Sequence, residues 1–131
     1  IWSFGEEAYE IMKKYVWIRE NLRPYIQEQF DLASADGTPI TRPMVYEFCD
    51  PECANMFDQY LFGPDLMVCP VYEAGCTQRQ VYLPRGQAWQ DAYTGERLEG
   101  GQWICVSCPL DTIPLFLREG GALSPKLFQV E

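Results

Sequence analysis

The chain has 131 residues, of which 47% are hydrophobic and 15% aromatic. This length allows one ordinary domain, or a small domain with an appendage, and is short for the larger classes of whole enzyme. Its 19 acidic and 10 basic residues give a net charge of −9. Nucleic acid and anionic membrane surfaces both require clustered Lys and Arg, so this charge excludes them and favours a neutral ligand or a protein partner.

We looked for a membrane span along the sequence and for a signal peptide at its start. No apolar run approaches the roughly 20 residues that a membrane-spanning helix needs. Residues 1–5 do not join a basic region to an apolar one, so we expect no signal peptide. Because the first residue is not Met and Trp2 and Phe4 follow at once, we expect an excised piece of a longer protein.

The first third of the chain is predicted to be helical. Ser3 and Glu6 have the spacing of a capping box, which starts a helix. Pro24 should kink or split the helix near Leu22-Arg23, and Asp36-Gly37 should end it. Apolar residues recur at three- and four-residue steps and predict one stripe that packs on a partner: Ala8, Ile11, Met12, Tyr15, Ile18, Leu22, Tyr25 and Ile26.

The stretch Asp58–Tyr72 carries the clearest strand signal. Two apolar runs, Tyr60–Phe62 and Leu66–Val71, flank Gly63-Pro64-Asp65, and this break forbids a continuous helix. Leu66 to Cys69 are apolar at consecutive positions, which predicts a strand covered on both faces. We expect these two runs to form the central strand pair of a β-domain.

Further strands are predicted on both sides of this pair. Ile40–Phe48 alternates loosely around Pro43, which is typical of an edge or a bulge. Gly100-Gly101 suits a two-residue hairpin turn. A meander of antiparallel strands is expected at Gln78–Leu83, Gln87–Tyr93 and Gln102–Cys108, with a last strand at Ile113–Leu117. The predicted fold class is α+β, a helical segment followed by an antiparallel β-sandwich.

Six cysteines raise the question of a zinc site: Cys49, Cys53, Cys69, Cys76, Cys105 and Cys108. The chain has no His, the first pair has three intervening residues, and an offset of three along a strand sends Cys105 and Cys108 to opposite faces. We therefore expect no metal and no cofactor, but small buried thiols in a reducing compartment, the cytoplasm.

Catalytic motifs are scarce. Without His, neither a Ser-His-Asp nor a Cys-His arrangement can form within this chain, and Gly100-Gly101 is not followed by a helix as in a phosphate loop. The remaining possibilities for this chain are catalysis by carboxylates or the binding of a ligand. Asp58 and Asp111 adjoin apolar strands and are the acidic residues hardest to dismiss. The others, expected in caps, turns and strand ends, are Glu6, Glu7, Glu47, Asp65, Asp91 and Glu96.

Three aromatic residues lie in or near the predicted hairpins: Trp89, Tyr93 and Trp103. Large rings dominate the interiors of sandwiches, so core filling is the first expectation. Rings on a sheet can also stack on sugars, which leaves a freestanding carbohydrate-binding sandwich as an alternative function.

Many short motifs, in order and spacing, resemble the C-terminal part of glycoside hydrolase family 31, the α-glucosidase and α-xylosidase family. The motifs are Trp2-Ser3-Phe4-Gly5-Glu6-Glu7-Ala8, Leu22-Arg23-Pro24-Tyr25, Gly37-Thr38-Pro39, Arg42-Pro43-Met44, Tyr60-Leu61-Phe62-Gly63-Pro64-Asp65-Leu66, Val81-Tyr82-Leu83-Pro84, Tyr93-Thr94-Gly95, Glu99-Gly100-Gly101 and Leu110-Asp111-Thr112-Ile113-Pro114. They span residues 2–121, nearly the whole chain.

The resemblance implies a division of roles. Residues 1–36 would be the last helical portion of a (β/α)8 barrel, and residues 37–131 the C-terminal β-sandwich domain behind it. The family hydrolyses α-glucosides or α-xylosides with retention, using two Asp on upstream barrel strands. Neither Asp falls within this chain, so we transfer no catalytic, cofactor-binding or metal-binding residue. The implied partners are the remainder of the barrel and the carbohydrate substrate.

Two cysteines depart from the family pattern. Cys49 stands where Pro is usual, and Cys69 where Ala is usual; small buried side chains explain both. In this interpretation the chain alone hydrolyses nothing. The apolar stripe, with Trp17, would cover the flank of the barrel, so in isolation we expect self-association or instability.

Overall fold

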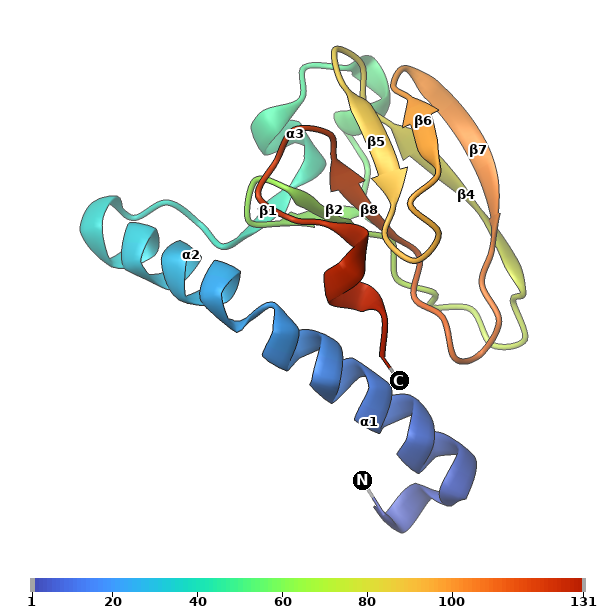
Figure 1. Ribbon diagram of the computed structural model, residues 1–131. Helices are drawn as coiled ribbons and strands as arrows, with labels where there is room; N and C mark the ends of the chain where they lie inside the picture. Colours follow the sequence, from blue (N-terminus) through green and yellow to red (C-terminus); the bar gives the residue numbers. More distant parts are fainter. Residues whose placement is uncertain (1, 131) are drawn as a thin grey trace.

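The computed structural model describes residues 2–130, with the side chain of Trp2 outside the described part. Two helices, α1 (Glu6–Asn21) and α2 (Arg23–Asp36), form a long rod beside two antiparallel sheets (Figure 1). One sheet has the order β1-β2-β3-β8-β5-β6 and the other pairs β4 with β7. Helices with antiparallel sheets agree with the predicted α+β class.

The strands are short. Those of the larger sheet are β1 (Thr41–Pro43), β2 (Tyr60–Phe62), β3 (Leu66–Val68), β5 (Ala88–Asp91), β6 (Arg97–Glu99) and β8 (Leu115–Arg118). The smaller sheet has β4 (Gln78–Leu83) and β7 (Gln102–Ser107). A helical turn α3 (Met44–Glu47) and the 3-10 turns η1 (Trp2–Phe4), η2 (Pro51–Cys53) and η3 (Pro125–Phe128) complete the chain.

The strand β3 lies in the middle of the larger sheet, between β2 and β8. Neighbouring residues point to opposite faces of a strand. Accordingly Met67 is fully buried in the core between the two sheets, whereas Leu66 is buried on the face that the helices cover. The predicted coverage on both faces is confirmed, although the strand ends at Val68 and not at Val71.

The core between the sheets is closed at one edge by a side chain. Gln59, which is buried, accepts a hydrogen bond from the Tyr82 amide (2.8 Å) and donates one to its carbonyl oxygen (2.9 Å). The Gln59 amide thus takes the place of a neighbouring strand for β4. The core itself contains Met44, Phe48, Cys53, Leu61, Met67, Cys69, Val81, Tyr82, Leu83, Trp89 and Phe116.

The helices pack on the other face of the larger sheet. Ile18, Leu22 and Tyr25 share a core with Leu115 and Leu117. The expected stripe exists, since all its members are buried or half-buried. The expectation that this stripe covers a barrel is wrong, because its buried centre faces the chain's own sheet.

The predicted helix limits are partly confirmed. Leu22 separates the helices, with Pro24 in the first turn of α2, and Gly37 ends α2 in the left-handed region. The capping box does not form. Ser3 lies in η1, and α1 begins after Gly5 without a side-chain cap. No helix within residues 2–130 is both long and apolar enough to span a bilayer.

The strand predictions need three corrections. Of the segment 40–48, only Thr41–Pro43 forms a strand, and this strand lies at the sheet edge, as Pro43 suggested. The chain then turns into α3. The predicted meander is wrong, since β4 pairs with β7 while β5 belongs to the larger sheet and pairs with β6, a strand the sequence did not predict.

Gly100-Gly101 is therefore a crossing between sheets and not a hairpin turn. Gly100 passes so close to the chain after β4 that a Cβ would lie 2.2 Å from the Pro84 carbonyl oxygen. The Gly101 amide donates to the Leu83 carbonyl oxygen (2.6 Å). The close approach of the two segments, and not a hairpin, explains the glycine at position 100.

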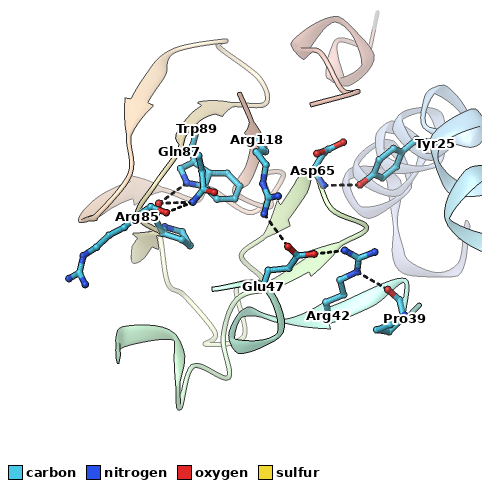
Figure 2. Close-up of polar contacts among 10 residues, drawn as sticks. Tyr25, Pro39, Arg42, Glu47, Asp65, Arg85, Gln87, Trp89 and Arg118 are labelled. Carbon is cyan, nitrogen blue, oxygen red and sulfur yellow. Dashed lines mark hydrogen bonds and ion pairs between the residues drawn. The ribbon is translucent and has the colours of Figure 1, made fainter. Parts of the chain in front are cut away.

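One contact ties α2 to the central hairpin. The Tyr25 hydroxyl donates to the Phe62 carbonyl oxygen (2.9 Å) and accepts from the Asp65 amide (3.0 Å; Figure 2). Gly63, between β2 and β3, has a φ of 66°, and a Cβ there would lie 2.2 Å from the Tyr25 hydroxyl oxygen. The turn needs glycine both for its conformation and for this contact.

The first prediction compares two glycines. Gly63→Ala should lower the free energy of unfolding by about 2–5 kcal/mol, because the left-handed penalty and the overpacking against Tyr25 add together. Gly37→Ala is the control, since Gly37 has a φ of 79° but open space around it. It should lose only about 1–2 kcal/mol in urea unfolding. Equal losses would contradict the contact.

The second prediction uses pH. Burial raises the pKa of Tyr25 to about 12. The unfolded side chain loses its proton near about pH 10, so above that pH the folded state alone holds the proton and stability falls.

The free energy of unfolding of the wild type should exceed that of Tyr25→Phe by a constant amount below about pH 10, and by less and less up to about pH 12. The control Tyr46→Phe alters a side chain that is half exposed. A Tyr25 difference that stays constant throughout would count against the buried hydroxyl.

Candidate functional site

The two acidic candidates are held by separate cations. Asp58 pairs with Arg79, whose Nη2 lies 3.1 Å from the Asp58 Oδ2. Asp111 is exposed, and its Oδ2 lies 4.0 Å from the Lys14 Nζ. The structure gives Asp58 and Asp111 different partners on different elements and does not bring them together as a pair.

Another carboxylate, that of Glu47, lies between two arginines (Figure 2). The Arg42 Nη1 donates to one of its oxygens (2.5 Å), and the Arg118 Nη2 lies 3.7 Å from the other. The Arg118 guanidinium also stacks over Phe48 and Trp89, at 5.2 and 5.9 Å from the ring centroids. This cluster fastens α3 to β8.

The remaining candidate acids have ordinary positions. Asp91 accepts from the Tyr93 and Thr94 amides and so shapes the turn between β5 and β6. Asp65 accepts from the Ala122 amide (3.1 Å). Glu6, Glu7 and Glu96 are exposed.

Asp111 and Tyr93 both lie at the junction between α1 and the sheets, where each contacts Tyr15. The Tyr15 hydroxyl donates to the Asp111 carbonyl oxygen (3.1 Å) and accepts from the Ile113 amide (2.7 Å). The Tyr93 hydroxyl donates to the Ile113 carbonyl oxygen (2.7 Å), and burial raises the pKa of Tyr93. The Lys14 Nζ donates to the Asp111 carbonyl oxygen (2.9 Å). These groups hold the loop before β8 against α1.

Of the three candidate sugar-stacking rings, only Trp103 is half exposed. Trp89 has no exposed surface; it packs edge-on against Phe48 and its indole nitrogen donates to the Pro84 carbonyl oxygen (3.2 Å). Tyr93 serves the junction just described. Core filling is thus the role of Trp89, whereas the Trp103 side chain is 53% exposed.

The cysteines are all free. Cys105 is exposed and Cys108 buried, as the strand geometry predicted. Cys69 is fully buried, as expected, and burial raises its pKa to about 12. The expectation that Cys49 is also buried is wrong, because its side chain is exposed after α3. Within residues 2–130, no three Cys, Asp or Glu side chains lie close enough to hold a metal ion.

Two apolar surfaces are exposed in the structure, and of their residues only Trp17 was singled out from the sequence. On the helices, Val16, Trp17, Phe30 and Leu32 are 41–56% exposed. On the sheet side, Phe57 and Tyr72 are exposed next to each other, with ring centroids 6.2 Å apart. For Tyr72 the sequence did contain a signal. The apolar strand gives way to Cys69-Pro70, and a proline there indicates that the chain leaves the sheet before Tyr72.

An apolar hollow of about 600 Å³ lies at the start of α1. It is lined by Phe4, Gly5, Glu6, Glu7, Ala8, Ile11, Met12 and Leu110. Phe4 and Leu110 are 75% and 80% exposed. The start of the apolar stripe on α1 therefore extends beyond the chain's own sheet and leaves apolar surface open.

Comparisons with known proteins agree on one family. The model of the glycosyl hydrolase family 31 C-terminal domain matches residues 37–123. An alpha-xylosidase of Saccharolobus solfataricus is 42% identical over 123 residues, 93% of this chain and 17% of the relative. Alpha-glucosidase 2 of Bacillus thermoamyloliquefaciens is 37% identical over 124 residues, 94% of this chain and 16% of the relative.

Solved structures give the same result. A GH31 alpha-xylosidase from a soil metagenome, complexed with xylose, has a TM-score of 0.89 and 47% identity, covering 93% of this chain and 18% of that one. A Flavobacterium johnsoniae GH31 dextranase complexed with glucose has a TM-score of 0.86 and 38% identity, covering 92% and 15%. The chain spans 16–18% of the first relatives it matches. It belongs to glycoside hydrolase family 31, in which it corresponds to the C-terminal domain.

Proposed function

We propose that the chain is the C-terminal part of a retaining α-glycosidase that acts on α-xylosides or α-glucosides. It supplies structure to this enzyme and not the catalytic carboxylates. Residues 1–36 are the last helical portion of the (β/α)8 barrel, and residues 37–131 are the sandwich behind it. The partners are the remainder of the barrel and the carbohydrate substrate.

The observation that carries this proposal is the two-sided helical segment. One side of α1 and α2 is buried on the sheet through Ile18, Leu22 and Tyr25. The other side leaves Trp17 and Phe30 more than half exposed. Exposed apolar surface of this kind is typical of an interface with another body, which here is the barrel. The expected self-association in isolation rests on the same surface.

The chemistry of the relatives supports a retaining mechanism. The cycloalternan-degrading enzyme of Trueperella pyogenes, 37% identical and with a TM-score of 0.76, has been solved with a covalent intermediate. A covalent glycosyl-enzyme is the mark of retention and needs two carboxyl groups about 5–5.5 Å apart. Asp58 and Asp111 are bound by different cations, so this chain is proposed to leave that pair to the barrel.

The higher identities suggest which sugar to test first. They are 42% and 47% to two alpha-xylosidases, against 37% to alpha-glucosidase 2 and 38% to the dextranase. We therefore propose α-xylosides as the first class of substrate to test, and α-glucosides as the second. The cytoplasm remains the proposed compartment, in keeping with the six free thiols.

The third prediction concerns activity. The chain alone should release no nitrophenol from p-nitrophenyl α-xyloside or α-glucoside above the rate in buffer, because it lacks the carboxylate pair. The full product of the gene that encodes it should hydrolyse at least one of the two. Turnover by the chain alone, or a full product inert on both substrates, would overturn the proposal.

A further inference from the structure

A hollow of about 240 Å³ lies beside the free edge of β4. Its lining comes from β4, β7 and the segments that precede β2 and follow β3, with no residue from α1 or α2. The residues that matter below are Asp58, Tyr72, Gln78, Arg79, Gln80 and Trp103. Small-molecule pockets begin at roughly 300 Å³, so a hollow of this size suits one small ring.

One wall is a supported aromatic platform. Trp103 lies on β7 opposite Tyr82 of β4, with ring centroids 5.2 Å apart and the planes tilted by 49°. Tyr82 is 1% exposed, and its hydroxyl donates to the Asp50 Oδ2 (2.9 Å). The Trp103 ring therefore packs against the buried Tyr82 ring, while about half of the Trp103 side chain stays exposed to solvent. Tyr72 adds a second exposed ring to the lining.

Polar groups line the hollow beside this platform. The Arg79 side chain is only 9% exposed and is fixed by hydrogen bonds to the Pro70 and Gln80 carbonyl oxygens. Its Nη2 lies 3.1 Å from the Asp58 Oδ2, yet it is buried without an aligned hydrogen bond. Because this atom is covered, it holds the Asp58 carboxylate in place and does not itself meet a ligand. Asp58 supplies acceptors next to it.

The edge of β4 that pairs with no other strand is partly occupied by the chain's own groups. Tyr82 already exchanges both backbone hydrogen bonds with Gln59. Residues two apart in a strand direct their backbone groups to the same edge. At that edge the Gln80 carbonyl accepts from the Arg79 Nε (3.3 Å) and the Gln78 carbonyl from the Cys76 Sγ (2.7 Å). An added strand would find these acceptors occupied.

We propose that this hollow is a carbohydrate-binding site for one pyranose ring of a neutral oligosaccharide. The apolar face of the ring stacks on Trp103, and its hydroxyls bond to the Asp58 carboxylate, which Arg79 holds in place, and to the Gln80 side chain. The ligand is neutral because Asp58 and Arg79 cancel each other's charge and the net charge of −9 repels anions. This site is independent of the proposed catalytic function.

The fourth prediction tests the site with the intact chain. Saturation-transfer NMR with maltotriose, isomaltotriose and cellotriose should show saturable binding of at least one sugar. Trp103→Ala should weaken that binding by roughly tenfold or more, because the stacking surface is lost. Gln80→Ala should weaken it by roughly twofold to tenfold, the range of one hydrogen bond.

The matched control is Trp17→Ala. Trp17 is 54% exposed, close to the 53% of Trp103, but lies on α1. It should leave the sugar signal unchanged, and thermal melts should show that all three variants remain folded. No saturable binding of any of the three sugars, or equal losses for Trp103→Ala and Trp17→Ala, would overturn the site. Binding of an extended peptide at this edge with all sugars inert would do so too.

Discussion

The structure depends on covering both faces of the larger sheet. Its middle strands β2, β3 and β8 are apolar on both sides, as Leu66 and Met67 illustrate, and neither face can be left in water. The β4–β7 pair and α3 cover one face, and α1, α2 and η3 cover the other. The helical segment and the sandwich therefore share a core, so the division that we propose at residue 36 concerns their proposed roles and does not separate two independent cores.

This constraint also explains why only one side of the helices is buried. Their inner side is used by the sheet, through Ile18, Leu22 and the Tyr25 hydroxyl at Gly63. Their outer side, with Trp17 and Phe30, has no partner within the described residues. A rod that is fixed on one side and apolar on the other is a good link between a catalytic barrel and its supporting domain. The proposed sugar site lies on the β4–β7 side, where such a link would leave it free.

Local signals predicted local features well. Gly63-Pro64-Asp65 marked the turn between β2 and β3, Pro24 the break between the helices, and Gly37 their end. Two local signals failed, since the capping box at Ser3 and Glu6 does not form and residues 44–47 turn into α3, but the errors in strand pairing are non-local. The pairing of β4 with β7 depends on the close approach of the chain at Gly100. The short strand β6 carries little strand signal of its own and is recognised by its pairing with β5. The same limit applies to the sites, since the Asp58–Arg79 pair joins segments that only the fold brings together.

The central claim is that the outer side of α1 and α2 is covered in the longer enzyme. Hydroxyl-radical footprinting tests it most directly, by comparing oxidation of Trp17 and Trp103 in this chain and in the full gene product. Both side chains are about half exposed here. The account predicts that Trp17 becomes protected in the full product while Trp103 stays reactive. Unchanged oxidation of Trp17 in an active full-length enzyme would contradict it.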